Sequence, residues 1–255
     1  MILICWVKTG KTEKKNTHPG TLTVQARNDR RGYYAHVSKI FFQNRYETMS
    51  LLNLLVESPV AFFLTAIPLL YAVIFHEIAH GLVAYRLGDP TAKFSGRLSL
   101  NPLKHLDPMG TLMLLLIGFG WARPVPVNFA NLPGDRKTIV AVSAAGIVTN
   151  ILLAFVALFL LRLMEPTTGG ALSTGLTWFA YINIILAAFN LIPIPPLDGS
   201  KMLMPFLPTP LRQAFLRLEP FGLLIIIGLL FLGVLTPLIR GMFAIIYGLV
   251  GIFLP

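Results

Sequence analysis

Charged residues are scarce in this sequence. They make up 13% of the 255 residues, while apolar residues make up 55%. A soluble globular domain carries about 25% charged residues, so this chain lacks the side chains to cover a water-facing surface. Cysteine is scarcer still, because Cys5 is the only one, and this excludes an internal disulfide and a cysteine-based zinc cluster. The composition argues against a soluble enzyme, a disordered protein and a coiled coil, and it favours a polytopic membrane protein.

The positive charge is concentrated near the N-terminus. Residues 1–48 carry nine Lys/Arg and three Asp/Glu, a net charge of +6 out of the +10 of the whole chain. Such a segment can bind nucleic acid or anionic lipid, but it is also typical of a solvated tail, which we favour. We therefore predict a basic, disordered tail over residues 1–48, or an upstream extension of the gene model. A membrane-embedded domain follows over residues 49–255, with no nucleic-acid partner.

Long uncharged runs predict membrane-spanning helices, because a helix needs roughly 20 apolar residues to cross the hydrocarbon core. The runs cover residues 58–75, 139–161, 166–197, 220–239 and 241–255, and a shorter one covers residues 108–122. We expect an all-α protein with about five to six membrane segments. Two stretches, residues 88–101 and 123–128, look like short strands, and the prolines of the second suit a sheet edge.

The basic loops indicate an orientation. Loops 81–107, 123–137 and 199–219 are rich in Lys and Arg and are expected on the cytoplasmic side, whereas loop 162–175 is expected outside. The run at 108–122 lies between two basic loops, so it is better explained by a re-entrant hairpin or a short buried helix than by a span. This arrangement places the basic tail outside, against the positive-inside tendency.

Residues 76–80 read His-Glu-Ile-Ala-His and continue the first predicted membrane helix. Side chains at positions i and i+4 share one helical face about 6 Å apart, so His76 and His80 can bind one zinc ion. Glu77 between them can act as a general base on a water at the metal. Chance is the alternative, but an ionisable group at membrane depth costs about 2.5–3.5 kcal/mol and is by default a functional hypothesis. We predict a metal site.

A second signal lies at residues 190–199, which read Asn-Leu-Ile-Pro-Ile-Pro-Pro-Leu-Asp-Gly. The three prolines break a membrane helix, and Asp198 follows the break at the predicted depth of His76 and His80. Catalytic zinc takes three protein ligands and keeps one open position, so a carboxylate here can be the third ligand. A surface turn is the alternative, and beside the His-Glu-x-x-His helix we favour the ligand.

The two motifs together resemble the site-2 protease family, peptidase family M50, of intramembrane zinc metalloproteases. Residues 101–110, 119–128 and 142–150 resemble further motifs of its short bacterial and archaeal branch, which lacks a PDZ domain. The resemblance covers roughly residues 58–255. The chain departs from the family at Ile147, where Gly-Pro-x-x-Asn usually has its proline, and this leaves the local helix geometry in question.

The resemblance implies one Zn²⁺ per chain with His76, His80 and Asp198 as its ligands. It further implies that Glu77 is the catalytic base and that Asn190 contacts the substrate backbone or the oxyanion.

Three further residues are candidates for supporting the site. His105 and Asp107 either orient a ligand or shuttle a proton, or they simply cap a loop, since Asn-Pro and Asp-Pro favour turns. We place both near the site. Asn150, in the last of the family-like segments, is a further candidate partner of a ligand.

The function implied is hydrolysis of peptide bonds in or near the transmembrane segments of membrane-protein substrates. The expected location is a bacterial or archaeal plasma membrane, with the active site toward the cytoplasm. The extended stretch 123–128 is a candidate for capturing an unwound substrate by strand addition. Two alternatives are a zinc-binding membrane transporter and an inactive scaffold. A transporter favours several liganding sites along a pore, and a scaffold is disfavoured because all four catalytic positions are present.

Overall fold

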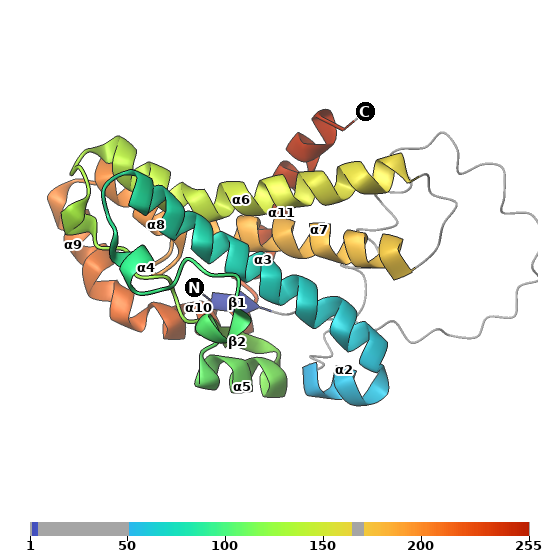
Figure 1. The fold of residues 1–255 in the computed structure, drawn as a ribbon. Helices are drawn as coiled ribbons and strands as arrows, with labels where there is room; N and C mark the ends of the chain where they lie inside the picture. Colours follow the sequence, from blue (N-terminus) through green and yellow to red (C-terminus); the bar gives the residue numbers. More distant parts are fainter. Residues whose placement is uncertain (1, 5–50, 165–170, 255) are drawn as a thin grey trace, which may run out of the picture.

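The computed structural model describes residues 2–4, 51–164 and 171–254, and helices dominate it (Figure 1). Most of the predicted basic tail lies outside these residues. Within them, five helical segments are long and apolar enough to cross a membrane: Pro59–Arg86, Arg136–Leu163, Leu172–Asn190, Thr209–Phe231 and Leu235–Ile252. The prediction of an all-α polytopic membrane protein is therefore confirmed.

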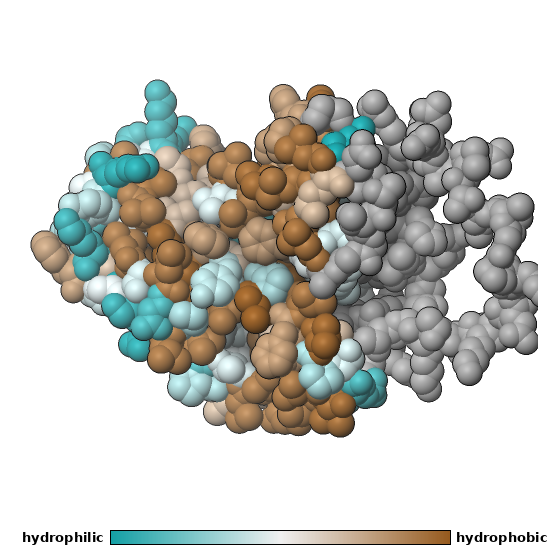
Figure 2. All heavy atoms as spheres, turned by 45° about the vertical axis from the view of Figure 1, so that its right-hand side comes forward, coloured by the Kyte–Doolittle hydropathy of each residue, from teal (hydrophilic) through white to brown (hydrophobic). Residues whose placement is uncertain are grey.

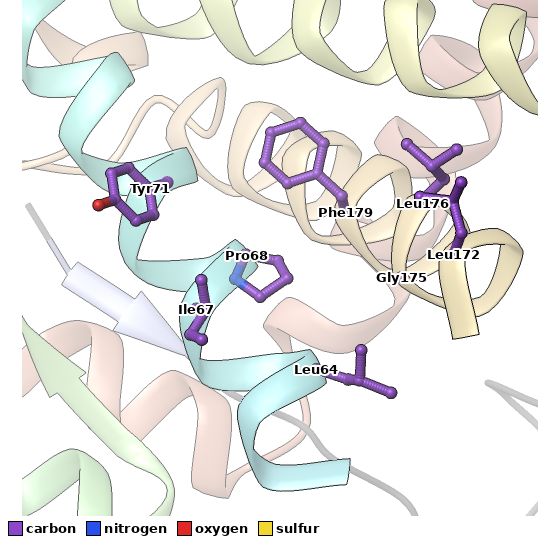
Figure 3. A pocket seen from close by; sticks show the side chains of 8 residues that line it. All are labelled: Leu64, Ile67, Pro68, Tyr71, Leu172, Gly175, Leu176 and Phe179. Carbon is purple, nitrogen blue, oxygen red and sulfur yellow. The ribbon is translucent and has the colours of Figure 1, made fainter. Parts of the chain in front are cut away.

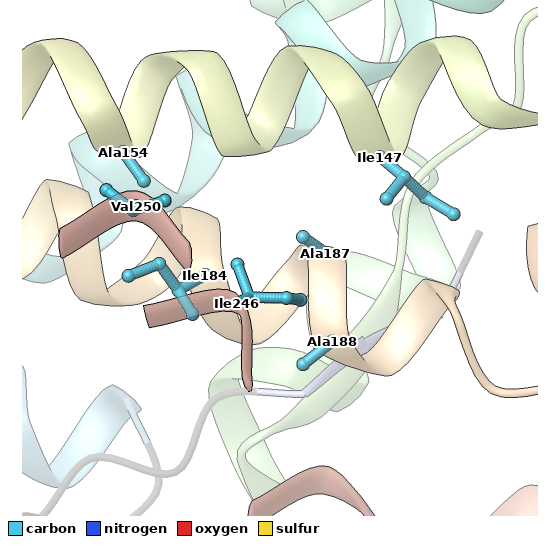
Figure 4. Close-up of a cluster of buried hydrophobic side chains, with 7 residues drawn as sticks. All are labelled: Ile147, Ala154, Ile184, Ala187, Ala188, Ile246 and Val250. Atoms are coloured by element: carbon cyan, nitrogen blue, oxygen red, sulfur yellow. The ribbon is translucent and has the colours of Figure 1, made fainter. Parts of the chain in front are cut away.

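Three helices form the centre of the molecule. These are α3 (Pro59–Arg86), α6 (Arg136–Leu163) and α7 (Ala171–Asn190), and each packs against the other two. Helix α11 (Leu235–Ile252) packs on α7 and α6. Figure 4 shows part of this contact, in which alanines lie among branched side chains, and small residues of this kind let helices approach closely. The buried residues of this cluster are Ile147, Ala154, Ile184, Ala187, Ala188, Ile246 and Val250.

The outward faces of these helices are apolar. Val60 and Phe63 on α3 and Leu152 on α6 are each more than half exposed. Figure 2 shows apolar side chains over much of the face that it displays. Such a surface suits contact with lipid chains, and α3, with 28 residues, is about 42 Å long and so exceeds the hydrocarbon thickness.

The start of α3 follows from its local sequence. Ser58 caps the helix by accepting a hydrogen bond from the backbone of Ala61, and Pro59 occupies the first helical position, where no donor is lost. The preceding helix α2 (Leu51–Glu57) buries Leu51 and Leu54. The residues packed against them lie in α3 and in α5, so α2 ties the beginning of α3 to the connection that follows the end of α3.

The connection between α3 and α6 contains only short elements. They are α4 (Thr91–Phe94), η1 (Pro102–Lys104), α5 (Pro108–Ile117), β2 (Phe119–Trp121) and η2 (Phe129–Asn131). Helix α5 turns back at Gly118, whose φ of 72° is left-handed, and the chain returns along it as β2. Residues 108–122 therefore form a helix–strand hairpin, and its re-entry into the membrane stays a prediction. Strand β1 (Ile2–Ile4) pairs antiparallel with β2.

Both stretches expected as strands differ from that prediction. Residues 88–101 contain the helical turn α4, because Asp89 accepts a hydrogen bond from the backbone of Thr91 and starts it. Residues 123–128 are assigned no strand, and the strand lies just upstream at β2. Pro124 and Pro126 lack the N–H groups that a ladder needs, which explains why pairing ends before them.

The C-terminal part also divides differently from the uncharged runs. It consists of α8 (Asp198–Leu203), η3 (Met204–Phe206), α9 (Thr209–Leu218), η4 (Glu219–Phe221), α10 (Gly222–Phe231) and α11. The runs placed a boundary at Arg240, but Arg240 lies inside α11 and the break is at Gly233, with a φ of 73°. That placement was wrong because a single exposed charge does not end a helix, whereas a left-handed glycine does.

Candidate metal centre

Helix α3 carries three ionisable side chains into the protein interior. His76 is fully buried, and Glu77 and His80 are at most 8% exposed. The i and i+4 spacing puts both imidazoles on one face, which is covered by α6. Burial of three such groups is costly unless each has a partner, so the partners determine what the site can do.

Asp198 is the first residue of α8, and its carboxylate lies against the imidazoles of His76 and His80. Its Oδ2 lies 3.0 Å from Nε2 of His76 and 3.2 Å from Nε2 of His80, and the two Nε2 atoms are 3.0 Å apart. Among the described residues this is the one group of three His, Cys, Asp or Glu side chains whose ligand atoms all lie within 4.8 Å of one another. Asp198 lies 118 positions after His80 in the sequence and 122 after His76, and the fold brings it to them.

Hydrogen bonds on the far side of each ring determine which nitrogen carries the proton. Nδ1 of His80 lies 2.7 Å from the carbonyl oxygen of Val142, which can only accept, so Nδ1 donates. Nδ1 of His76 donates to Oδ1 of Asn150 at 2.5 Å. Each neutral ring therefore presents the lone pair of Nε2 toward the other ring and toward Asp198.

The donor set fits a zinc ion. Two nitrogen lone pairs and a carboxylate oxygen lie so close together that the atoms repel one another unless a cation or a proton lies between them. Zinc bonds of about 2.0–2.2 Å in tetrahedral geometry place neighbouring ligand atoms about 3.3–3.5 Å apart, close to the separations found here. A protein set of two histidines and one carboxylate is also that of hydrolytic zinc sites, which keep a fourth position open.

Gly146 on α6 keeps the space beside this group clear. A Cβ atom at position 146 would lie 2.5 Å from Nε2 of His76 and 2.5 Å from Nε2 of His80. Any side chain at position 146 would therefore occupy space that a metal ion bound to the two Nε2 atoms needs. Ile147, the departure from the family pattern, does not interrupt α6, which runs without a break past the site and packs Ile147 into the cluster of Figure 4.

Asp198 is positioned by the end of α7. The chain leaves α7 at Asn190, passes the prolines of residues 193–196 in a tight loop and re-enters helix at Asp198. Burial raises the pKa of Asp198, but the positive charge and the hydrogen bonds that the imidazoles of His80 and His76 supply when they are protonated outweigh it and hold the pKa well below its usual range. The carboxylate is thus ionised and available as a ligand. Lys201 approaches its other oxygen at 4.0 Å.

Glu77 is held by a loop that the sequence did not connect to it. Its Oε2 accepts a hydrogen bond of 2.8 Å from the backbone N–H of Val125. Nη2 of Arg97 in turn donates to the carbonyls of Arg123 and Pro124 at 2.6 and 3.0 Å. The extended residues 123–125 therefore lie beside the candidate base, anchored on one side by Arg97 and on the other by Glu77.

The same loop is anchored a second time by Asp89. One carboxylate oxygen accepts from the backbone of Asn128 at 2.7 Å, and the other accepts from the side chain of Asn131 at 2.8 Å. Burial raises the pKa of Asp89, but the hydrogen bonds from Thr91, Asn131 and Asn128 outweigh it and lower the pKa below its usual range. The ionised carboxylate holds residues 128–131 against the end of α3.

Three predicted site residues lie outside the group of three ligand atoms. His105 is 1% exposed and its Nε2 donates to the carbonyl of Ser99 at 2.7 Å. Asp107 caps α5 through a 2.8 Å hydrogen bond from Gly110. Asn190 donates to the carbonyl of Leu186, one turn back in its own helix. Their predicted roles at the site stay predictions.

Sequence reasoning missed Asn183, Val125 and Arg97. Asn183 on α7 is fully buried and bonded to Asn150 at 2.7 Å. An amide inside an apolar helix was the available signal for Asn183, because such a group needs a partner. Val125 acts through its backbone, which no sequence pattern reports.

An apolar cavity of about 400 Å³ lies between α3 and α7, away from this group (Figure 3). Its walls are formed by Leu64, Ile67, Pro68, Tyr71, Leu172, Gly175, Leu176 and Phe179. The lining offers a single polar group, the hydroxyl of Tyr71, so this cavity has none of the chemistry of the metal centre.

The fold and the centre define a class. A buried His-Glu-x-x-His helix, completed by a carboxylate from a second membrane-associated segment, is the arrangement of a membrane zinc metallopeptidase. Comparison with known proteins supports this class. The model of peptidase family M50 matches residues 165–234, which include the Asp198 motif.

Relatives extend the match. YwhC of Bacillus subtilis, named as a zinc metalloprotease, is 45% identical over 179 residues, 68% of this chain and 80% of that protein. Rip2 of Mycolicibacterium smegmatis, named likewise, is 31% identical over 70% of this chain and 69% of its own length. MJ0611 of Methanocaldococcus jannaschii is 30% identical over 57% of this chain and 72% of its own. No solved structure matches the chain.

The chain belongs to peptidase family M50. It is a zinc metalloprotease with the helices of a multi-pass membrane protein.

Proposed function

We propose that the protein hydrolyses peptide bonds in or beside the transmembrane segments of membrane-protein substrates, with one Zn²⁺ per chain. His76, His80 and Asp198 are its ligands and Glu77 is the base. The observation that carries the proposal is the convergence of the three ligand atoms within 4.8 Å, with Glu77 on the same helix. This centre sits on helices that are apolar enough to span a membrane, so the substrate bond must be reached at or near the bilayer.

The chemistry divides between the ion and the chain. Bound zinc would polarise the scissile carbonyl and lower the pKa of water to about 7. Glu77 takes a proton from the attacking water and passes it to the leaving amine. The hydrogen bond from Val125 to Oε2 fixes the carboxylate, so that Oε1 is the oxygen that takes the proton. Asn190 is the proposed contact to the substrate backbone or oxyanion, and it must first give up its bond to Leu186.

A substrate helix must unwind before its backbone can be cleaved. We propose that the extended edge formed by β2 and residues 122–128 receives the unwound strand. The pairing of Ile2–Ile4 with β2 supports this mode, because an extended apolar strand already fits that edge. Residues 123–125, which run on from this edge, contact Glu77.

We further propose residues 49–255 as the protease unit, placed in a bacterial or archaeal plasma membrane with the centre toward the cytoplasm. The basic residues of the loop that carries α4 and of the loop that carries α8 and α9 support this orientation.

The experiment is metal analysis and proteolysis with the full chain reconstituted in liposomes. The substrates are a set of single-span model proteins and, separately, soluble casein. Wild type should hold about one zinc per chain and cut the single-span proteins in or near the membrane. Glu77→Gln should keep the zinc and lose about 10²–10⁴-fold in rate, the usual contribution of a general base.

His76→Ala is the matched control, because it should lose both the zinc and the activity. Cleavage by Glu77→Gln at the wild-type rate would contradict the role of Glu77. Cleavage of casein without cleavage of any single-span protein would contradict the substrate class and leave the zinc centre standing.

A further inference from the structure

A chain of three amide and imidazole groups runs from α7 through α6 to the candidate ligand His76. Asn183 on α7, Asn150 on α6 and His76 on α3 are all fully buried. These three helices pack side by side (Figure 1). Nδ1 of His76 donates to Oδ1 of Asn150, and Nδ2 of Asn150 lies 2.7 Å from Oδ1 of Asn183.

The direction of every bond in this chain is set by backbone carbonyls. Nδ2 of Asn183 donates to the carbonyl of Phe179 at 2.8 Å, so Asn183 must turn its oxygen toward Asn150. Nδ2 of Asn150 also donates to the carbonyl of Ala72 at 3.2 Å. The carbonyl of Ala72 and Oδ1 of Asn183 can only accept hydrogen bonds, so the nitrogen of Asn150 must face them. The oxygen of Asn150 is therefore the atom that faces His76.

The orientation of Asn150 matters because it selects the tautomer of His76. With the oxygen toward the ring, Nδ1 carries the proton and Nε2 keeps the lone pair that faces Asp198 and His80. With the amide turned over, Nδ1 would have to accept, Nε2 would carry the proton, and His76 could not act as a ligand.

We infer that Asn183 is a positioning residue of the metal centre, which acts through Asn150 to fix the ligating tautomer of His76. The inference rests on the proposed zinc centre. The imidazole of His80 needs no such relay, because the carbonyl of Val142 accepts directly from its Nδ1. Hydrogen bonds to the outer nitrogen of a metal-binding histidine are worth about 10–100-fold in metal affinity, which sets the expected size of the effect.

The test replaces Asn183 and measures zinc affinity by chelator competition on the full chain in detergent. Asn183→Leu removes the nearer of the two acceptors that hold Nδ2 of Asn150 and leaves only the 3.2 Å bond to the carbonyl of Ala72. Asn150 then turns over more readily, and the zinc dissociation constant should rise about 10–100-fold. Asn183→Ala should give a similar rise if the leucine variant does not fold, because a water in its place can donate or accept and imposes no orientation. Thr177→Val is the matched control on α7, since it removes a side-chain bond to Ser173 one turn back and touches none of the relay.

Two further measurements separate positioning from a merely structural role. In metal-free protein labelled with ¹⁵N-histidine, His76 should be protonated at Nδ1 in wild type and mixed between the two tautomers in Asn183→Leu. The double variant Asn150→Asp with Asn183→Leu should regain part of the lost zinc affinity, because an ionised carboxylate offers His76 only acceptor oxygens, while its second oxygen faces the carbonyl of Ala72.

An Asn183→Leu protein that binds zinc as tightly as Thr177→Val, or that keeps Nδ1 of His76 protonated, would overturn the inference. Failure of the wild-type chain to bind zinc at all would instead overturn the proposed centre, so the two failures can be told apart.

Discussion

The backbone N–H of Val125 donates a 2.8 Å hydrogen bond to Oε2 of Glu77, across 48 positions of sequence. This bond joins the candidate base on a membrane helix to the extended loop that follows β2. It does two things at once, because it fixes one oxygen of the base and ties the proposed substrate edge to the site of chemistry. Anything that shifts residues 123–125 should therefore change the orientation of Glu77.

Arg97 is the residue whose loss should shift that loop. Arg97→Met removes the guanidinium that holds the carbonyls of Arg123 and Pro124, and the proteolytic rate should fall about tenfold or more because the base is no longer held in place. Zinc content should stay at the wild-type level. Arg86→Met, which removes an exposed positive charge at the end of α3, should have little effect on either quantity. Parallel loss of zinc in Arg97→Met would show a wider structural role.

Gly146→Ala should damage metal binding directly. The added methyl group would lie 2.5 Å from both Nε2 atoms, and the imidazoles can move only by giving up their bonds to Asn150 and Val142. Zinc affinity should fall by at least about 10–100-fold. Gly228→Ala is the control, because an added Cβ there meets nothing within 4 Å, and isothermal titration with zinc compares the two. Equal affinities would mean that the metal does not sit beside Gly146.

Asp198→Ala should weaken zinc binding by about 10–100-fold or more and abolish proteolysis, because the ion is left with two protein ligands. His105→Ala should keep its zinc, since His105 is bonded to Ser99 and lies outside the group of three. Equilibrium dialysis of the two variants beside wild type decides the matter. Loss of zinc in His105→Ala with retention in Asp198→Ala would reverse the assignment of the third ligand.

Asp89 should make the stability of the loop region depend on pH. Its pKa in the folded protein is lowered below the unfolded value of about 3.9, so its contribution is complete above that value and disappears as the pH falls through the folded pKa. Asp89→Asn should therefore lower the melting temperature at pH 7 by about 2–4 °C. The difference from wild type should shrink below about pH 4.

Melting curves for this prediction are recorded with a chelator, so that loss of metal at low pH does not contribute. Glu57→Gln, which removes the same charge from an exposed position at the end of α2, is the matched control. A constant gap between Asp89→Asn and wild type from pH 7 to pH 3 would contradict the role of the ionised carboxylate.

The sequence by itself determined the class of the molecule and the residues with unusual chemistry. The scarcity of charge and the uncharged runs predicted a helical membrane protein, because hydrophobic length and the period of the helix are local properties. His76, Glu77 and His80 were recognisable for the same reason, since their spacing alone puts them on one helix. Asp198 was recognisable because prolines break a helix wherever they occur.

The tertiary structure decided everything that depends on contacts between distant segments. The sequence predicted that Asp198 meets the two histidines, but the 3.0 Å approach of Asp198 to His76 is a property of the fold. The bond from Val125 to Glu77 and the relay from Asn183 join segments that no sequence pattern had connected. Backbone groups such as the carbonyls of Val142, Ala72 and Phe179 are present in every residue, so no pattern of side chains can reveal which of them will fix a tautomer. Only packing places a given carbonyl opposite a given nitrogen, and in this protein that placement selects which nitrogens of His76 and His80 face Asp198.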